Sequence, residues 1–310
     1  MSDIILHNYP QSPVAEKVRV ALGIKGLAWR SVEIPRIPPK PLLTELTGGY
    51  RRTPVMQIGA DIYCDSQCIM RELERRHPDP SFFPDGSRGL AWGLSRWTDG
   101  TLFEQVIKIV LGSAGDALPR DFAKDRGRLY LGPDWAVGLR KAQGDLPHLA
   151  AQVRAQFGWI DQRLVQSGDF LFGDRPGLAD AVAYHVIWFL RGRWTDGPAF
   201  LSEFPALQDW EARIHAIGHG TATALSPEAA IDIAVSADSA APQGVDAGDP
   251  QGLEPGMRVT VNPDVDGGEQ PVTGLVRYAD RETIAVARIG DRAGTVCVHF
   301  PRAGYRVRPL

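Results

Sequence analysis

Ser12 is the residue best placed to do chemistry, because it stands where a predicted helix begins. Residues 4–6 are an apolar run typical of a buried strand, and residues 8–11 have the composition of a loop. Ser is a preferred N-cap, and Pro13 suits the first helical position. The apolar residues that follow recur at helical spacing: Val14, Val18, Ala21 and Leu22. The pattern therefore places a hydroxyl at the positive end of a helix, where an anion such as a thiolate is stabilised. A plain N-cap is the alternative interpretation.

Short strands and helices within residues 1–80 must position this hydroxyl. The expected elements after the first helix are a strand (28–34), a Pro-rich loop (35–41), a helical turn (42–46), a hairpin (54–58 with 62–64) and a helix that Asp65-Ser66 opens and His77-Pro78 ends. This β-α-β, loop, β-β-α order predicts a small α/β domain with a mixed sheet.

The rest of the chain changes character twice. Residues 78–88 have the composition of a linker, and residues 89–225 are predicted to form an all-helical domain. Its expected helices are a long apolar one over Trp92–Leu111 and others over Leu146–Leu164, Leu178–Leu190 and Leu207–Ile217. A short helix over Ser226–Val235 and a linker over residues 237–252 follow. Residues 253–310 are predicted to form a small closed all-β barrel of SH3-like size, with strands at 257–261, 272–278, 283–289, 295–300 and 305–307.

The composition limits the classes of protein to which the chain can belong. The chain has 310 residues, 44% hydrophobic and 23% charged, which is typical of a globular protein of two or three domains. Its net charge of -3 argues against general binding to nucleic acid or to a membrane surface. Cys64, Cys68 and Cys297 form neither a disulfide framework nor a zinc motif, so we expect no metal. Since we find neither a signal peptide nor an apolar run of transmembrane length, we expect a cytoplasmic protein.

Four ordered motifs give most of the chain a family resemblance. Ser12-Pro13 is similar to the start of the family's first helix, and Arg52-Thr53-Pro54-Val55 to its basic/Val-Pro-Val segment. Asp65-Ser66 is similar to the Glu/Asp-Ser pair that opens the third helix, and Gly173–Asp180 to the segment that caps a buried helix. From about Ser2 to Leu225 the sequence therefore resembles the glutathione S-transferase (GST) superfamily. The resemblance implies a thioredoxin-like N-terminal domain and an all-α C-terminal domain, to which the SH3-like barrel is appended.

The resemblance implies that the tripeptide glutathione lies along one edge of the sheet. The Thr53 backbone would pair with its cysteinyl part as an added strand pairs with a sheet edge, and a cis Pro54 would turn that backbone toward the ligand. Asp65 would take the ammonium of the γ-glutamyl end. Ser66 and the helix N–H groups would take its carboxylate. Plain capping is the alternative interpretation of this pair.

Further residues join the implied site. Arg52 matches a position that contacts the ligand backbone, with a solvated charge as the alternative, and Lys40 could reach the glycyl carboxylate. A small apolar electrophile would bind between the two domains. The candidates for lining that pocket are Trp92, Trp97, Phe103 and Tyr130, for which ordinary core packing is the alternative. Family members dimerise through these domains, so we expect a homodimer.

Within the resemblance Ser12 gains a catalytic role with glutathione as co-substrate. A free thiol has a pKa of about 8.5, so only a few per cent is thiolate at neutral pH. A hydroxyl donor at a helix end could lower this pKa by about one to two units, and the thiolate would then add to the electrophile. Tyr9 is the alternative donor, but Ser12 fits the helix alignment better. Thiol transfer through a protein cysteine is not expected, and Cys64 and Cys68 are predicted to be packing residues.

The C-terminal part supports a competing hypothesis. Residues 271–310 carry seven Arg and three acids, a charge of +4, which leaves -3 - 4 = -7 for the rest. Because no aromatic stacking pattern accompanies the charge, nucleic acid is not expected, and the barrel is predicted to pack on its own acidic body or on a second subunit. The barrel, the Pro-rich loop and Gly177 in place of the family's Ser or Thr cap favour a non-catalytic GST-fold scaffold, with the barrel as interaction module. A glutathione transferase remains the first hypothesis, and its electrophile and exact reaction stay open.

Overall fold

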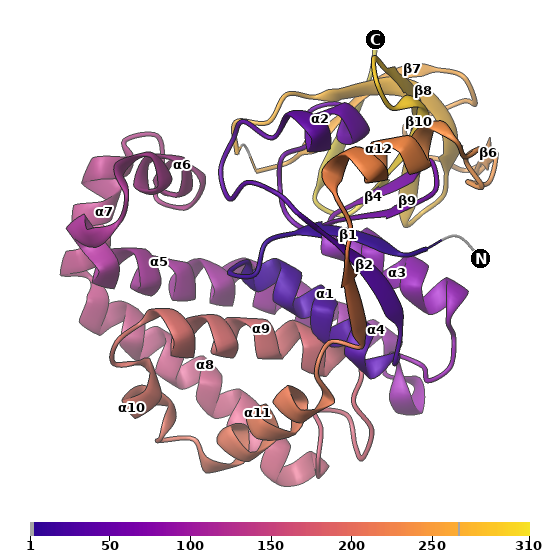
Figure 1. The fold of residues 1–310 in the computed structure, drawn as a ribbon. Coiled ribbons are helices and arrows are strands. Elements are labelled where there is room, and N and C mark those ends of the chain that lie inside the picture. The colour runs from indigo at the N-terminus through magenta and orange to yellow at the C-terminus, as the bar shows by residue number, and fades with distance from the viewer. Residues whose placement is uncertain (1–2, 266) are drawn as a thin grey trace. The chain divides into compact units, whose positions relative to one another are not determined.

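The computed structural model describes residues 3–265 and 267–310, which fall into two compact units. The first unit contains the chain up to residue 18 together with residues 27–76 and 221–310, and the second contains residues 19–26 and 77–220. Ser2, where the family resemblance begins, lies outside the described residues. The C-terminal strands therefore belong to the same unit as the thioredoxin-like part (Figure 1).

The first unit holds every strand assigned in the described residues, and Figure 1 labels most of its elements. Its thioredoxin-like elements are β1 (Ile5–Asn8), α1 (Pro13–Ile24, shared with the second unit), β2 (Ala28–Glu33), α2 (Pro41–Thr47), β3 (Val55–Ile58), β4 (Asp61–Cys64) and α3 (Ser66–Arg76). Its later elements are β5 (Thr221–Ala224), α12 (Pro227–Val235), β6 (Gly244–Val245), β7 (Arg258–Pro263), β8 (Val272–Ala279), β9 (Thr283–Gly290), β10 (Gly294–Pro301) and β11 (Tyr305–Pro309). Each strand expected from sequence is present within two residues of its predicted bounds.

The register of the N-terminal sheet brings three chain segments to one edge. β1 runs parallel to β2 and antiparallel to β3, so that His7 pairs with Val55. β3 is antiparallel to β4, and Val55 also pairs with Cys64. The end of β1, the start of β3 and the end of β4 therefore meet. The segments that follow or precede them there contain Ser12, Thr53 and Asp65.

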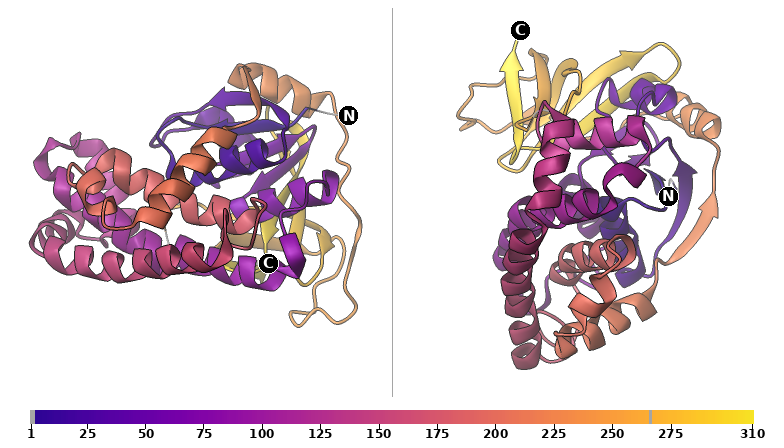
Figure 2. Two further views of the ribbon diagram at one scale, coloured as in Figure 1. Left: turned by 90° about the horizontal axis from the view of Figure 1, so that it is seen from below. Right: turned by 90° about the vertical axis from the view of Figure 1, so that its left-hand side faces the viewer.

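The five C-terminal strands continue this sheet. They follow the order β11-β7-β8-β9-β10, each antiparallel to the next, and β10 then pairs in parallel with β4. Figure 2 shows these strands (yellow) from two further sides. The strand-rich appended region is thus confirmed, and the chain packs it on its own N-terminal part. β5 pairs with β2 at the opposite edge, so both edges of the N-terminal sheet are covered.

One hydrophobic core serves both parts of the first unit. It joins Ile5, Val32 and other buried residues of the N-terminal elements to residues of α12 and of the C-terminal strands, such as Val286 and Phe300. Burying one such side chain is worth about 1.5–3 kcal/mol, so separating the two parts would expose many times that amount. The appended strands are therefore a fixed part of this unit.

The second unit is helical, as expected. Its helices are α4 (Arg88–Trp97), α5 (Phe103–Ala114), α6 (Arg120–Tyr130), α7 (Trp135–Gly144), α8 (Leu146–Ser167), α9 (Leu178–Arg193), α10 (Gly197–Leu201) and α11 (Pro205–Ile217). The single helix expected over Trp92–Leu111 is wrong, because a π-helical turn at Thr98–Leu102 divides it into α4 and α5. Gly100 carries the break with a ψ of -110°.

The start of α9 explains the unusual Gly177. A Cβ at this position would lie 2.6 Å from the Phe82 carbonyl oxygen, which already accepts the N–H of Leu178. The Asp180 carboxylate accepts the N–H of Gly177 at 2.9 Å and the indole N–H of Trp210 at 2.8 Å. Glycine therefore allows a close backbone approach, and the Asp180 carboxylate satisfies the N–H of Gly177 itself.

Candidate functional site

Ser12 lies at the N-terminus of α1 and caps it. Its Oγ accepts a hydrogen bond from the N–H of Ala15 at 3.2 Å, and its carbonyl accepts the N–H of Glu16 at 2.9 Å. The residue is 2% exposed. Because the hydroxyl oxygen acts as an acceptor here, its own proton remains able to donate to a second group. The predicted N-cap is confirmed, and the Ser12 hydroxyl can still donate a hydrogen bond at the start of α1.

Three other predicted residues gather at this end of the sheet. The buried Lys40 donates from Nζ to the Thr53 Oγ1 at 3.0 Å and lies 5.8 Å from the centre of the Tyr9 ring. The peptide between Thr53 and Pro54 is cis, as the resemblance implies. The structure thus brings together Tyr9 from the segment after β1, Lys40 from the segment before α2 and Thr53 from the segment before β3.

Asp65 opens α3 with a left-handed φ of 74°. Its Oδ1 accepts the N–H of Gln67 at 2.8 Å, while Ser66 beside it is buried. Its Oδ2 accepts the hydroxyl of Tyr305 at 3.0 Å. The residue implied to hold the ligand's ammonium therefore already receives a donor from β11.

Arg52 is likewise engaged by the C-terminal part. Its guanidinium forms an ion pair with Glu269, in the segment between β7 and β8, and also donates to the Val265 carbonyl. Burial alone would lower the pKa of Arg52, but the Glu269 carboxylate raises it. The neighbouring Arg51 donates to the Gly267 carbonyl. The alternative of a solvated surface charge is therefore wrong for Arg52.

Tyr50 completes this contact and was not found from sequence. Its hydroxyl oxygen lies 3.3 Å from that of Tyr305, and the two rings pack with Phe300. Since Tyr305 has one proton and donates it to Asp65, it accepts that of Tyr50. Burial, and then the Asp65 charge, raise the pKa of both tyrosines well above the usual value. Tyr305 lies 240 positions from Asp65, and no motif links them.

The residues predicted to line an electrophile pocket lie in the second unit and form no single cluster. Phe103 meets Tyr130 edge to face, with 5.8 Å between ring centres. Trp97 instead stacks near Trp159 of α8 at 5.8 Å, and Trp92 contacts a ring outside the predicted set. Phe103 and Tyr130 are thus in direct ring contact.

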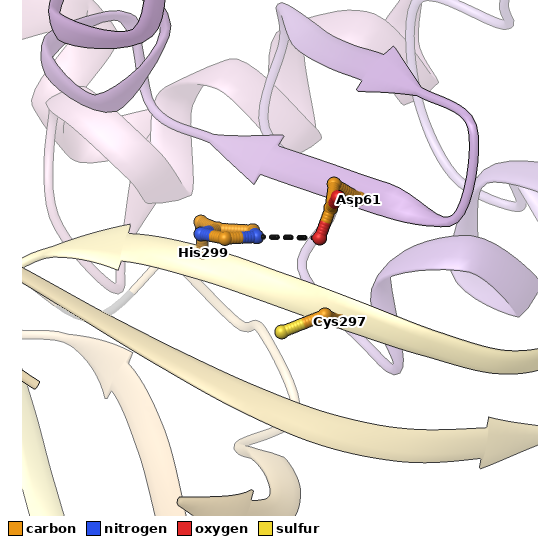
Figure 3. A group of neighbouring side chains, drawn as sticks. All are labelled: Asp61, Cys297 and His299. Carbon is orange, nitrogen blue, oxygen red and sulfur yellow. Dashed lines mark hydrogen bonds and ion pairs between the residues drawn. The ribbon is translucent and has the colours of Figure 1, made fainter. Parts of the chain in front are cut away.

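One cluster in the described residues has donors of the kind that hold transition metals. The side chains of Asp61 on β4 and of Cys297 and His299 on β10 lie within 4.8 Å of one another (Figure 3). However, Asp61 already accepts hydrogen bonds from His299 Nε2 at 3.0 Å, from the Ser239 hydroxyl at 2.6 Å and from the Ala240 N–H at 2.8 Å. The cluster is therefore a satisfied ion pair that joins β4, β10 and the segment after α12.

The electrostatics of this ion pair are those of a buried charged imidazole. Burial alone would lower the pKa of His299, but the hydrogen bond and charge of Asp61 raise it to about 9. Asp61 responds oppositely: burial would raise its pKa, and the His299 bond lowers it. The other two cysteines, Cys64 and Cys68, are buried with thiol pKa values raised by that burial, so neither is a ready nucleophile.

Comparison with known protein families decides what this fold is. The model of the glutathione S-transferase N-terminal domain matches residues 6–81, and that of the C-terminal domain matches residues 122–213. The chain belongs to the glutathione S-transferase superfamily. Its GST domains are the thioredoxin-like part of the first unit and the helices of the second.

Individual relatives show how far the GST likeness extends. The crystal structure of a GST-like protein from Pseudomonas syringae is 37% identical, with 100% of each chain covered and a TM-score of 0.79, so it shares the C-terminal strands. FtsZ-localized protein A of Caulobacter vibrioides is 24% identical over 187 residues, which are 58% of this chain and 75% of that protein. A glutathione S-transferase from Rhodospirillum rubrum is 21% identical, with 69% and 88% of the chains covered and a TM-score of 0.52, and shows the fold alone. No helix in the described part of this GST is long and apolar enough to cross a membrane.

Proposed function

We propose that this protein binds reduced glutathione and stabilises its thiolate through Ser12, for transfer to a small apolar electrophile. The observation that carries the proposal is the register of the N-terminal sheet. It brings the starts of α1 and α3 and the Thr53 backbone to one edge. At that edge the Ser12 oxygen is already held by the Ala15 N–H, which leaves the hydroxyl proton to donate to sulfur.

The expected lowering of the glutathione thiol pKa follows from the hydrogen bond and the partial positive charge at a helix N-terminus. A hydroxyl donor to a charged acceptor and a helix N-terminus together contribute roughly 1.5–3 kcal/mol. This lowers the thiol pKa by about one to two units from about 8.5. Much of the bound glutathione would then be thiolate at pH 7.5.

The test is calorimetric titration of reduced glutathione at pH 7.5 in two buffers of different ionisation enthalpy. Wild type should release a large fraction of a proton per glutathione bound, and Ser12→Ala should release much less. Ser226→Ala is the matched control, because Ser226 caps α12 in the same way through the Ala229 N–H. If Ser12→Ala released as many protons as wild type, Ser12 would not be the thiolate donor, and Tyr9→Phe would test the alternative.

A second candidate, a non-catalytic scaffold, is favoured by the contacts of Asp65 and Arg52 with Tyr305 and Glu269. The relative named for its localisation with FtsZ agrees with such a role. In this case the C-terminal strands would serve as the interaction module. Absence of glutathione binding by wild type and by variants with the contacts removed would favour this candidate.

The remaining parts of the proposal concern the second substrate and the assembly. We propose that the apolar electrophile meets the ring cluster of Phe103 and Tyr130, and that the protein acts as a homodimer in the cytoplasm. Phe103→Ala should then raise KM for an aromatic electrophile without changing glutathione affinity. Light scattering of the purified protein would test the dimer.

A further inference from the structure

Two side chains of the C-terminal part face Asp65 and Arg52, which the family resemblance implies contact the ammonium and the backbone of the ligand. Tyr305 of β11 donates its hydroxyl to Asp65 Oδ2 at 3.0 Å. Glu269 presents its carboxylate to the Arg52 guanidinium. Gln67, on the first turn of α3, also donates from its side-chain amide to the Ala303 carbonyl of the C-terminal part at 3.4 Å.

These contacts have the same chemistry as the end of glutathione that they replace. A free α-amino acid end carries one ammonium, which is a hydrogen-bond donor, and one carboxylate. Tyr305 supplies a donor to Asp65, and Glu269 supplies a carboxylate to the adjacent cation. The chain thus supplies from its own side chains the donor that the γ-glutamyl ammonium would give Asp65 and an acceptor for Arg52.

The two side chains are held firmly in place. The Glu269 side chain is only 3% exposed, and its Oε2 accepts the Gly267 N–H at 2.9 Å. Tyr305 is 8% exposed and packs its ring against Tyr50 and Phe300. Because β10 pairs with β4 and one core spans both parts, the C-terminal strands do not open as a lid would.

We propose that Tyr305 and Glu269 are specificity-determining residues of the glutathione site, an inference that rests on the proposed function. Tyr305 takes the contact that the ligand's γ-glutamyl ammonium would make with Asp65, and Glu269 takes the contact that the ligand backbone would make with Arg52. The site therefore selects its thiol ligand through the cysteinyl and glycyl parts. Its ligand class is small peptide thiols, including those whose α-amino acid end is blocked or absent.

The test compares two ligands on four variants by calorimetry. Reduced glutathione carries the zwitterionic end, and N-acetylcysteinylglycine keeps the cysteinyl and glycyl parts without it. Tyr305→Phe keeps the ring packing and removes the donor, and Glu269→Gln keeps the shape and removes the charge. The matched controls are Tyr278→Phe, whose hydroxyl donates to Asp280, and Glu282→Gln, whose partner is Arg71.

The expected result separates the ligands. Wild type should bind both ligands with similar affinity. Tyr305→Phe and Glu269→Gln should each bind glutathione about tenfold more tightly, because Asp65 or Arg52 is then able to pair with the ligand. The affinity for N-acetylcysteinylglycine should not change, and the controls should behave as wild type.

Two results would overturn the inference, and they differ in what else they affect. If wild type binds glutathione much more tightly than the blocked thiol, and the two variants weaken it, Tyr305 and Glu269 support the γ-glutamyl end instead of replacing it, and the proposed function stands. If no variant binds either thiol, the proposed function fails together with the inference. Melting curves for each variant confirm that the comparison is made on folded protein.

Discussion

The buried pair of His299 and Asp61 should make the stability of the protein fall in the alkaline range. The pKa of His299 is raised from its ordinary 6.5 to about 9 by Asp61 and, after it, by Cys297, against the effect of burial. That difference is worth roughly 3 kcal/mol. A raised pKa stabilises the folded state below the unfolded value, so this contribution is complete below about pH 6.5 and is lost as the pH rises through about 9. Tyr63, which stacks on His299, stays neutral over this range because burial raises its pKa further.

The perturbation is His299→Gln, measured by urea unfolding at pH 6.5 and pH 9.5. At pH 6.5 the variant should be about 3 kcal/mol less stable than wild type, because removal of one partner leaves Asp61 as a buried charge with fewer donors. At pH 9.5 the two proteins should have similar free energies of unfolding. The control is His7→Gln. The pKa of His7 is lowered by burial to about 4, so this residue is neutral throughout the range.

The decisive quantity is the difference between wild type and variant at the two pH values. Titratable groups that do not contact His299 are the same in both proteins, so their effects cancel in that difference. If His299→Gln lost as much stability as wild type between pH 6.5 and pH 9.5, the imidazole would not be charged in the folded state. The assignment of Asp61 and His299 as an ion pair would then be wrong.

Two further predictions concern the start of α9. Gly177→Ala should lower the free energy of unfolding by about 1–3 kcal/mol in a urea titration, because its Cβ would meet the Phe82 carbonyl at 2.6 Å. An unchanged free energy of unfolding would mean that the backbone shifts to make room for the methyl group. Asp180→Ala should cost about 3 kcal/mol, because it leaves the buried N–H groups of Leu171, Gly177 and Trp210 without their acceptor. A loss below about 1 kcal/mol in the same measurement would show that water replaces the carboxylate.

Local signals predicted the part of the site that adjacent residues build. The cap at Ser12 and the start of α3 at Asp65-Ser66 each depend on a few neighbouring residues, and the structure has both. The five C-terminal strands were also predictable, because each is a short run with apolar and β-branched residues between turn residues. Short-range patterns of this kind carry through to the fold because propensity and burial agree.

Pairings between distant segments could not be predicted in the same way. Nothing in the sequence of β10 specifies that it pairs with β4, and Tyr305 carries no sign that it reaches Asp65. β5 was missed because Thr221–Ala224 is short, exposed and without large apolar residues, and it becomes a strand only by pairing with β2. Gly100 likewise breaks a helix whose apolar pattern continues on both sides of it.

The same contacts bear on both hypotheses for the function of this GST. An appended domain that only bound a partner could sit anywhere on the surface, but this one meets Asp65 and Arg52, which the family resemblance implies contact the ligand's ammonium and backbone. It leaves Ser12 and Thr53, at the thiol end, within the N-terminal part. If Ser12 binds the thiol as proposed, a Tyr305 hydroxyl on Asp65 is better explained by a change of ligand preference than by loss of chemistry. Retained proton release together with weak selectivity for glutathione is the pair of results that only this explanation predicts.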